Sequence, residues 1–226
     1  MATFGPGYHG PVRAAVLSAN AHNAQPWHFR VAQNRVDLFA DTSRSIGTMD
    51  SLGREMDVPL GCAIENLALA GPANGKAPTV SLLPDPADRS HIAGVHLVAT
   101  EQTVSGLFAA IANRHTNRSA CDTARPVTHR QFDALAGLMD LPDVELVWFT
   151  KAREKATFGD LTTRATKAIT ADPRQAADDF AWYRTDWAQI QAKKDRVTID
   201  PSGGSLLLRD LAKVLPVSRE QNNTGG

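Results

Sequence analysis

Apolar positions recur with two spacings along the first part of the chain. Pro11 suits the first turn of a helix, and the apolar residues of 12–17 form a short helical face behind it. Apolar and polar residues then alternate over 28–31 and 36–39, on either side of Asn34-Arg35, which predicts an antiparallel β-hairpin. Residues 41–53 read as a loop. From Met56 to Leu69 the spacing is again helical, and Gly71-Pro72 predicts where this helix ends.

Pro59 lies inside that helical pattern, where it removes a backbone donor. We expect either a late helix start near Pro59, with Asp57 as the cap, or a kink. Further along the chain the pattern predicts strands over 79–83, 94–99 and 144–149. It predicts helices over 104–113, 128–139, 151–170, 173–193 and 206–214.

This order of elements mixes hairpins with helical layers. It favours an α+β fold with helices packed on both faces of a mainly antiparallel sheet. No short-period repeat or low-complexity region interrupts the pattern.

Composition narrows the class of protein. The chain has 226 residues, with 42% apolar and 21% charged residues, so it can bury a proper core. Its 24 basic and 24 acidic residues cancel, which argues against a general nucleic-acid or membrane-surface partner. Cys62 and Cys121 are isolated, which is typical of a reducing, cytoplasmic environment. We also see no apolar run of membrane-spanning length and no export signal at the N-terminus.

The most informative short segment is His22-Asn23-Ala24-Gln25-Pro26-Trp27. Asn and Gln carry both donors and acceptors, and Pro26 biases Gln25 toward an extended conformation. Such a turn can present several hydrogen-bonding groups to a flat, polar heterocycle. The alternative is a surface turn in which Asn23 caps backbone groups and Trp27 anchors the core.

A second cluster, residues 113–118, follows the helix predicted over 104–113. Arg114 and Arg118 flank an imidazole and a hydroxyl, from His115 and Thr116. Arg binds phosphate in a bidentate manner, and Thr adds a donor, so the cluster is a candidate phosphate site. The alternative is a solvated cationic end of a helix.

Other chemistries find little support in the sequence. His22 and His28 lack a carboxylate pair at metal-ligand spacing. Neither a dinucleotide-binding glycine motif nor a P-loop is present, and the Gly-Gly near Ser202 lacks the context of a hydrolase nucleophile.

Taken together, the two clusters resemble a known family. The run from Asn20 to Trp27 is similar to the Pro-Ser-x-x-Asn-x-Gln-Pro-Trp signature of FMN-dependent nitroreductases, and residues 114–118 are similar to that family's arginine-rich phosphate motif. The chain resembles the fused, Acg-type nitroreductase-like proteins of actinobacteria more closely. The blocks that carry this resemblance, in order, are 39–44, 53–55, 114–118, 211–216 and 218–222.

The resemblance implies two pseudo-symmetric halves, 1–100 with the flavin-ring motif and 101–226 with the phosphate motif, and a single split FMN site between them. Arg114 and Arg118 would bind the phosphate, with His115 and Thr116 as further donors. The ring or ribityl chain would contact Asn20, Asn23 and Gln25. Trp27 is expected to be a wall or core anchor, and the direction of His22 stays open.

The function implied by the resemblance is NAD(P)H-dependent reduction of nitroaromatic or quinone-like acceptors, in which the flavin carries the hydride and no side-chain nucleophile is needed. Ala19-Asn20 replaces the usual Pro-Ser, and the usual C-terminal part is expected to be missing. A catalytically silent flavin-binding protein and a non-functional fragment therefore remain alternatives. Either a monomeric pseudo-dimer or a homodimer is compatible with the sequence.

Overall fold

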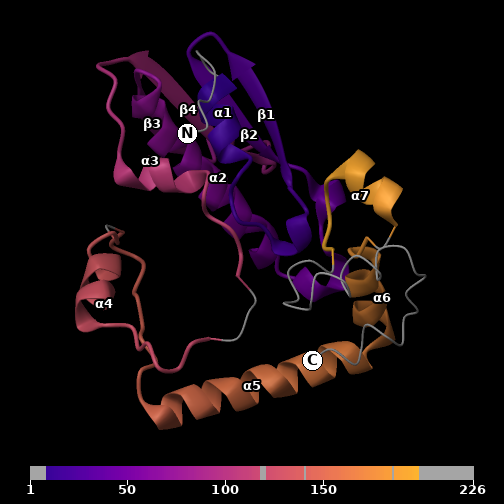
Figure 1. Ribbon diagram of the computed structural model, residues 1–226. Coiled ribbons are helices and arrows are strands. Elements are labelled where there is room, and N and C mark those ends of the chain that lie inside the picture. Colours follow the sequence, from indigo (N-terminus) through magenta and orange to yellow (C-terminus); the bar gives the residue numbers. More distant parts are fainter. Residues whose placement is uncertain (1–8, 118–120, 140, 185, 199–226) are drawn as a thin grey trace.

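The computed structural model describes residues 9–117, 121–139, 141–184 and 186–198, and these ranges contain a four-stranded sheet and seven α-helices (Figure 1). The α+β class is therefore confirmed. The first part of the chain contains α1 (His9–Ala15), β1 (Trp27–Ala32), β2 (Arg35–Ala40), α2 (Arg54–Ala73), β3 (Lys76–Leu82) and β4 (His91–Ala99). The rest contains α3 (Gly106–Ile111), α4 (His129–Ala136), α5 (Ala152–Ala171), α6 (Pro173–Ala181) and α7 (Trp187–Lys193).

The sheet has the order β1-β2-β4-β3, and every neighbouring pair is antiparallel. The hairpin predicted around Asn34-Arg35 is confirmed, with Phe29 opposite Leu38 and Val31 opposite Val36. The two later strands are also present, although each begins three residues before its predicted start. A register shift between Leu38 and Phe39 interrupts the pairing of β2 with β4.

The core lies between one face of the sheet and α2. Leu60, Ala63 and Leu67 of α2 are buried in one cluster with strand residues on that face, which are Trp27, Val36, Leu38, Ala93, Val95 and Leu97. Helix α1 packs against α2, and the Asn66 side chain of α2 donates to the carbonyl of Ala14 at 3.1 Å. One long helix thus holds both the sheet and α1.

The prediction that this helix starts late, near Pro59, is wrong. Helix α2 begins at Arg54, behind Gly53, whose φ of +73° turns the chain into the helix. The Asp50 carboxylate accepts from the Met56 amide at 3.0 Å, which satisfies one of the donors exposed at the helix start. This upstream capping, with Glu55 and Asp57 in the first turn, offsets the backbone donor lost at Pro59. The helix also passes Gly71-Pro72 and ends at Ala73.

The opposite face of the sheet carries a cluster of charged groups around Asp37. This carboxylate, almost fully buried, accepts from Arg35 Nε at 2.6 Å, Arg30 Nη2 at 3.1 Å and His91 Nε2 at 2.9 Å. The Phe39 ring stacks on the His91 imidazole, and the Arg30 guanidinium also lies over the Phe39 ring. Burial raises the pKa of Asp37, but the hydrogen bonds from Arg35, Arg30 and His91 outweigh it and hold the pKa below its ordinary value.

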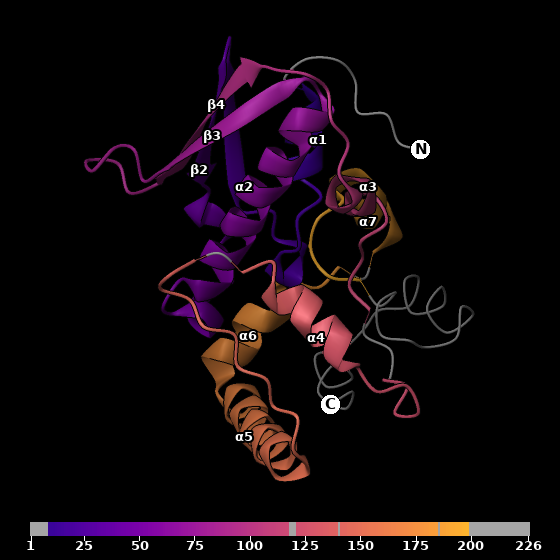
Figure 2. The ribbon, with the colours of Figure 1, turned by 90° about the vertical axis from the view of Figure 1, so that its left-hand side faces the viewer.

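The helices after the sheet differ from α2 in their packing. Helix α3 contributes a buried Ile111, whereas α4, α5, α6 and α7 contain no buried residue. Both views place α5 at the end of the molecule away from the sheet, with α6 leading back toward it (Figures 1 and 2). The helix predicted over 173–193 is divided into α6 and α7, because Asp186 begins a new helix by accepting from the Gln189 amide.

The strand predicted over 144–149 is absent from the described residues. Its side chains are taken up by the neighbouring helices: Trp148 packs against Phe132 of α4, and Phe149 against Phe158 of α5. A β-strand needs a neighbouring strand with free backbone N–H and C=O groups. An apolar segment that has no such neighbour packs its side chains on another apolar surface, here that of α4 and α5. The helix predicted over 206–214 lies outside the described residues.

Within the described ranges, no helix is both long enough and apolar enough to span a membrane. The division into halves at residue 100 remains a proposal, although the sheet of the described residues ends at Ala99.

Asp37→Asn is expected to lower the free energy of unfolding by about 2 kcal/mol at pH 7, because three charge-assisted hydrogen bonds are weakened at once. A carboxylate with a lowered pKa in the folded state stabilises the fold above its unfolded pKa, and this contribution is lost as the pH falls through the folded value. The difference between wild type and variant should therefore begin to shrink below about pH 4 and disappear only once the pH is below the folded pKa of Asp37.

Urea unfolding of wild type and variant at pH 7 and at pH 3 measures this difference in stability. The matched control is Asp143→Asn, at an exposed loop position. A loss of stability at Asp37 that is the same at pH 3 and pH 7 would show that its charge is not the cause.

Candidate functional site

The turn between α1 and β1 is held in an uncommon backbone conformation. His22, Asn23 and Gln25 all have positive φ, of +51°, +51° and +54°. Side chains other than Gly rarely adopt this region, and such residues collect where surrounding contacts fix them. The expectation that Pro26 biases Gln25 toward an extended backbone is wrong, because Gln25 lies in the left-handed region.

Asn20 is the residue that fixes the turn. Its side-chain oxygen accepts from the Gln25 amide at 2.8 Å, and its nitrogen donates to the Ser18 carbonyl at 3.1 Å. Ser18 is buried, and its hydroxyl reaches the Pro59 carbonyl of α2 at 3.5 Å. Trp27, on the far side of the turn, is 8% exposed and belongs to the main core. The turn is therefore anchored at both ends to the α2 core.

Arg114 reaches the same region from α3. Ile111 of α3 is buried with Ala14 of α1 and Ala70 of α2, and Phe108 packs against them. This contact places the end of α3 beside the end of α1, where Arg114 Nη2 donates to the Leu17 carbonyl at 3.1 Å. That contact uses one of the five N–H donors of a guanidinium.

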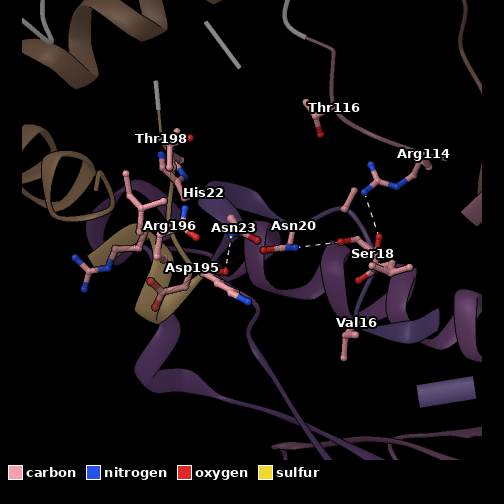
Figure 3. Close-up of a pocket in the computed structure, with 16 residues that line it drawn as sticks. Val16, Ser18, Asn20, His22, Asn23, Arg114, Thr116, Asp195, Arg196 and Thr198 are labelled. Atoms are coloured by element: carbon pink, nitrogen blue, oxygen red, sulfur yellow. Dashed lines mark hydrogen bonds between the residues drawn. The ribbon is translucent and has the colours of Figure 1, made fainter. Parts of the chain in front are cut away.

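These segments enclose a cleft of about 620 Å³, within the range typical of small-molecule sites. Arg114 and Thr116 lie on one side of it and His22, Asp195, Arg196 and Thr198 on the other, with Asn20 and Asn23 between (Figure 3). The remaining lining residues come from the end of α1 and from α7 with the segment after it: Val16, Leu17, Ser18, Ala19, Ile190, Gln191, Lys194 and Val197.

The structure brings together four of the predicted site residues: Asn20, Asn23, Arg114 and Thr116 all line the cleft. Gln25 and His115 are not among its lining residues. Gln25 faces Asn23 and the Lys194 carbonyl, and the exposed His115 imidazole contacts the Asn113 carbonyl at 3.1 Å. Arg118 lies outside the described residues. Its role, like that of the other six, stays a proposal.

Sequence reasoning missed one wall of the cleft, the segment that follows α7. Lys194, Arg196 and Thr198 all lie there, far from the turn in sequence. The charged run 193–196 at the end of a predicted helix was the available signal, but it equally fits a solvated helix end. Only the tertiary arrangement distinguishes the two.

His22 lines the cleft, which settles the direction left open by the sequence. Its Nε2 lies 3.0 Å from Asp179 Oδ1 of α6, and its ring meets the edge of Tyr183. Its Nδ1 is buried without a hydrogen-bond partner in the described part of the chain. A buried polar atom without a partner is costly, and it marks a place where a further group can bind.

A second contact holds α6 to the first part of the chain. The Asp178 carboxylate accepts from the Thr48 amide at 2.8 Å and from its hydroxyl at 2.6 Å. The Thr48 hydroxyl and amide hold the pKa of Asp178 below its usual range. Gly47 beside it has a φ of +72°, and a Cβ there would lie 2.5 Å from the Asp178 carboxylate. We call the Thr48–Asp178 contact the α6 latch.

The charges around the cleft favour an anion. Among the described residues, Arg114 and Lys194 bring cationic side chains to the lining, together with the carboxylate of Asp195. Arg196 also lines the cleft, but its guanidinium lies over the Trp182 ring and donates to the Ala181 carbonyl. Asp195 is bound by Arg184 Nε at 2.6 Å. Burial raises the pKa of Asp195, but this hydrogen bond and the charges of Arg184, Arg196 and Arg44 outweigh it and lower the pKa. The cleft therefore combines a cationic rim, carboxamides and an apolar wall.

Comparison with known proteins finds sequence relatives of this chain. The chain is 35% identical over 108 residues to a Mycobacterium tuberculosis protein named "Putative NAD(P)H nitroreductase Rv3131". The match covers 47% of this chain and 31% of that relative. No family model matches the chain.

Over about half of its length the chain is thus similar to proteins named as nitroreductases, which supports membership of the nitroreductase superfamily. Within it, the similarity extends to the M. tuberculosis protein named "Putative NAD(P)H nitroreductase acg", at 28% identity over 95 residues, which are 42% of this chain and 29% of that protein. The resemblance to Acg-type proteins is thereby confirmed. The matched part spans less than a third of the length of each of these relatives.

Thr48→Val is expected to loosen α6, because valine keeps the shape of threonine but cannot donate to Asp178. Amide hydrogen exchange over 173–181 should become about fivefold faster, which corresponds to one lost hydrogen bond. Thr48→Ser keeps the hydroxyl and is the matched control. If both variants exchange at the wild-type rate, the latch does not hold α6.

Proposed function

We propose that the cleft binds FMN and that the chain takes part in NAD(P)H-dependent reduction of nitroaromatic or quinone-like acceptors. One observation carries this proposal: the turn around Asn20 and Asn23 and the Arg114–Thr116 segment, about ninety residues apart in sequence, line one cleft. Their sequences resemble the ring and phosphate motifs of FMN-dependent nitroreductases, and the relatives are named as NAD(P)H nitroreductases.

The residues present fit the chemistry of this cofactor. Arg114 and Thr116 offer charge-assisted and hydroxyl donors for a phosphate at one side of the cleft. Val16 and Leu17 are about 40% exposed, and together with Ile190 they offer apolar surface to a ring. Asn23 brings a carboxamide, and His22 Nδ1 lacks a partner in the described residues.

When bound, FMN supplies the hydride-transferring atom, and the protein supplies binding, orientation and electrostatics. Arg114 and Thr116 hold one end of the ligand, and the turn holds the other. The cationic side chains of Arg114 and Lys194 attract an anionic ligand. A role for Gln25, His115 and Arg118 in cofactor binding belongs to the same proposal, as does the choice between NADH and NADPH.

The visible spectrum of the purified chain tests the proposal directly. We expect the absorption of a bound flavin after FMN is added and the unbound excess is removed, and bleaching by NADH or NADPH without oxygen. A chain that stays colourless after FMN addition would contradict flavin binding. A yellow protein that neither nucleotide bleaches would instead indicate a catalytically silent flavin-binding protein.

Arg114→Ala is expected to weaken FMN binding by about 10- to 100-fold, as for the loss of charge-assisted hydrogen bonds to a phosphate. Riboflavin, which lacks the phosphate, should bind nearly as well as it does to the wild type. Titration of flavin fluorescence measures both affinities. Arg130→Ala, at an exposed position of α4, is the matched control. Equal losses for FMN and riboflavin would remove the phosphate assignment.

A further inference from the structure

The segment 194–197, which we call the strap, lies directly on the turn of the cleft. The Lys194 carbonyl accepts from Gln25 Nε2 at 3.0 Å and from Asn23 Nδ2 at 3.3 Å. Two residues further on, the Arg196 amide donates to the Asn23 carbonyl at 3.2 Å. The strap thus offers the turn one acceptor and one donor, both from its backbone.

Both sides of this contact are held in a costly backbone conformation. Lys194 and Arg196 have φ of +52° and +68°, and they contact two turn residues, Asn23 and Gln25, that also have positive φ. Strain of this kind persists where neighbouring contacts fix it, and it gathers at ligand clamps and switch regions. The contact between strap and turn is therefore a specific arrangement of both segments.

The strap offers the turn a carbonyl acceptor and an N–H donor, and one edge of a flavin would offer the same two groups. The pyrimidine edge of an isoalloxazine carries carbonyl acceptors next to an N–H donor. The carboxamides of Asn23 and Gln25 are suited to the carbonyl, and the Asn23 carbonyl is suited to the N–H. Lys194 and Arg196 line the same cleft as Asn23, so the strap and a ring seated on the turn compete for the same space.

We propose that the strap occupies the place of the ligand's edge on the turn. This part of the cleft then selects planar ligands that carry an adjacent carbonyl and N–H, and such a ligand displaces the strap. This inference rests on the proposed function. It adds that the ligand-free chain is self-blocked at the ring end, while the Arg114 end stays open.

The strap is fastened from its outer side, away from the turn. Arg184 Nε binds Asp195 at 2.6 Å, the Arg184 amide donates to the Val197 carbonyl at 2.9 Å, and the Val197 amide donates to the Trp182 carbonyl at 2.9 Å. Arg184 does not line the cleft among the described residues. Its side chain can therefore be removed to loosen the strap while every described residue that lines the cleft is kept.

Limited trypsin cleavage after Arg196 in the full chain, followed by intact mass, reports strap release. We expect FMN and riboflavin to accelerate this cleavage about fivefold, as for the loss of contacts worth one to two hydrogen bonds. N3-methylriboflavin, which has no N–H at that edge, and inorganic phosphate, which has no ring, should leave it unchanged. Cleavage after Arg153 at the far end of α5 is the internal standard.

Several outcomes would overturn the inference. Protection of Arg196 by riboflavin would make the strap a part of the bound site, and acceleration by phosphate or by the N3-methyl compound would remove the role of the edge. If FMN binds with its spectrum and the Arg114 dependence described above but cleavage does not change, the strap inference fails alone. If no flavin binds at all, the proposed function fails, and the inference fails with it.

Arg184→Ala gives an independent measure. Without the Arg184–Asp195 pair, we expect faster cleavage after Arg196 in the ligand-free chain and about fivefold tighter riboflavin binding, because less of the binding energy is spent on displacing the strap. Gln189→Ala, which removes only the 3.0 Å contact of Arg184 with Gln189, is the matched control. Weaker riboflavin binding by Arg184→Ala would contradict competition between strap and ligand.

Discussion

Burial of one face of α2 against the sheet is the interaction on which the rest of the structure depends. Leu60, Ala63 and Leu67 join the strands into one core. The same helix also anchors the first wall of the cleft, by which we mean the segment after α1, the turn at 20–25 and Arg114. Asn66 binds the end of α1, the Pro59 carbonyl accepts from Ser18, and Ala70 packs on the α3 residue Ile111. A change in the position of α2 would therefore move the turn and Arg114 together.

The second wall is held by a different kind of force. The described residues of α6 and α7 include none that is buried, and the links to the first wall are polar: Thr48 with Asp178, His22 with Asp179, and the strap with the turn. Hydrogen bonds at an exposed surface contribute little each, and regions with few buried apolar contacts open at low free energy. The two walls of the cleft should thus differ in their free energy of opening. The first wall should open only when the core unfolds, and the second should open at a much lower free energy.

The sequence predicted those features that local pattern determines. Alternation predicted the β1–β2 hairpin, and helical spacing predicted most of α2. The family resemblance, which is not a local pattern, implied that Asn20, Asn23, Arg114 and Thr116 share one site, and all four line one cleft. The errors came where tertiary contacts decide. Capping by Asp50 lets α2 begin before Pro59, and the apolar run 144–149 packs on helices although its pattern fits a strand. Nothing local distinguishes a strap from a solvated helix end, so Lys194 and Arg196 were missed.

The left-handed residues of the turn and strap also restrict which sequences can carry this site. Five positions outside glycine, 22, 23, 25, 194 and 196, have positive φ where the two segments meet. Branched side chains such as valine and isoleucine fit that region poorly, whereas asparagine, aspartate and glycine fit it well. The five positions therefore form a fingerprint in which backbone geometry, more than side-chain chemistry, sets the allowed residues. A related chain can be searched for it before any ligand is known.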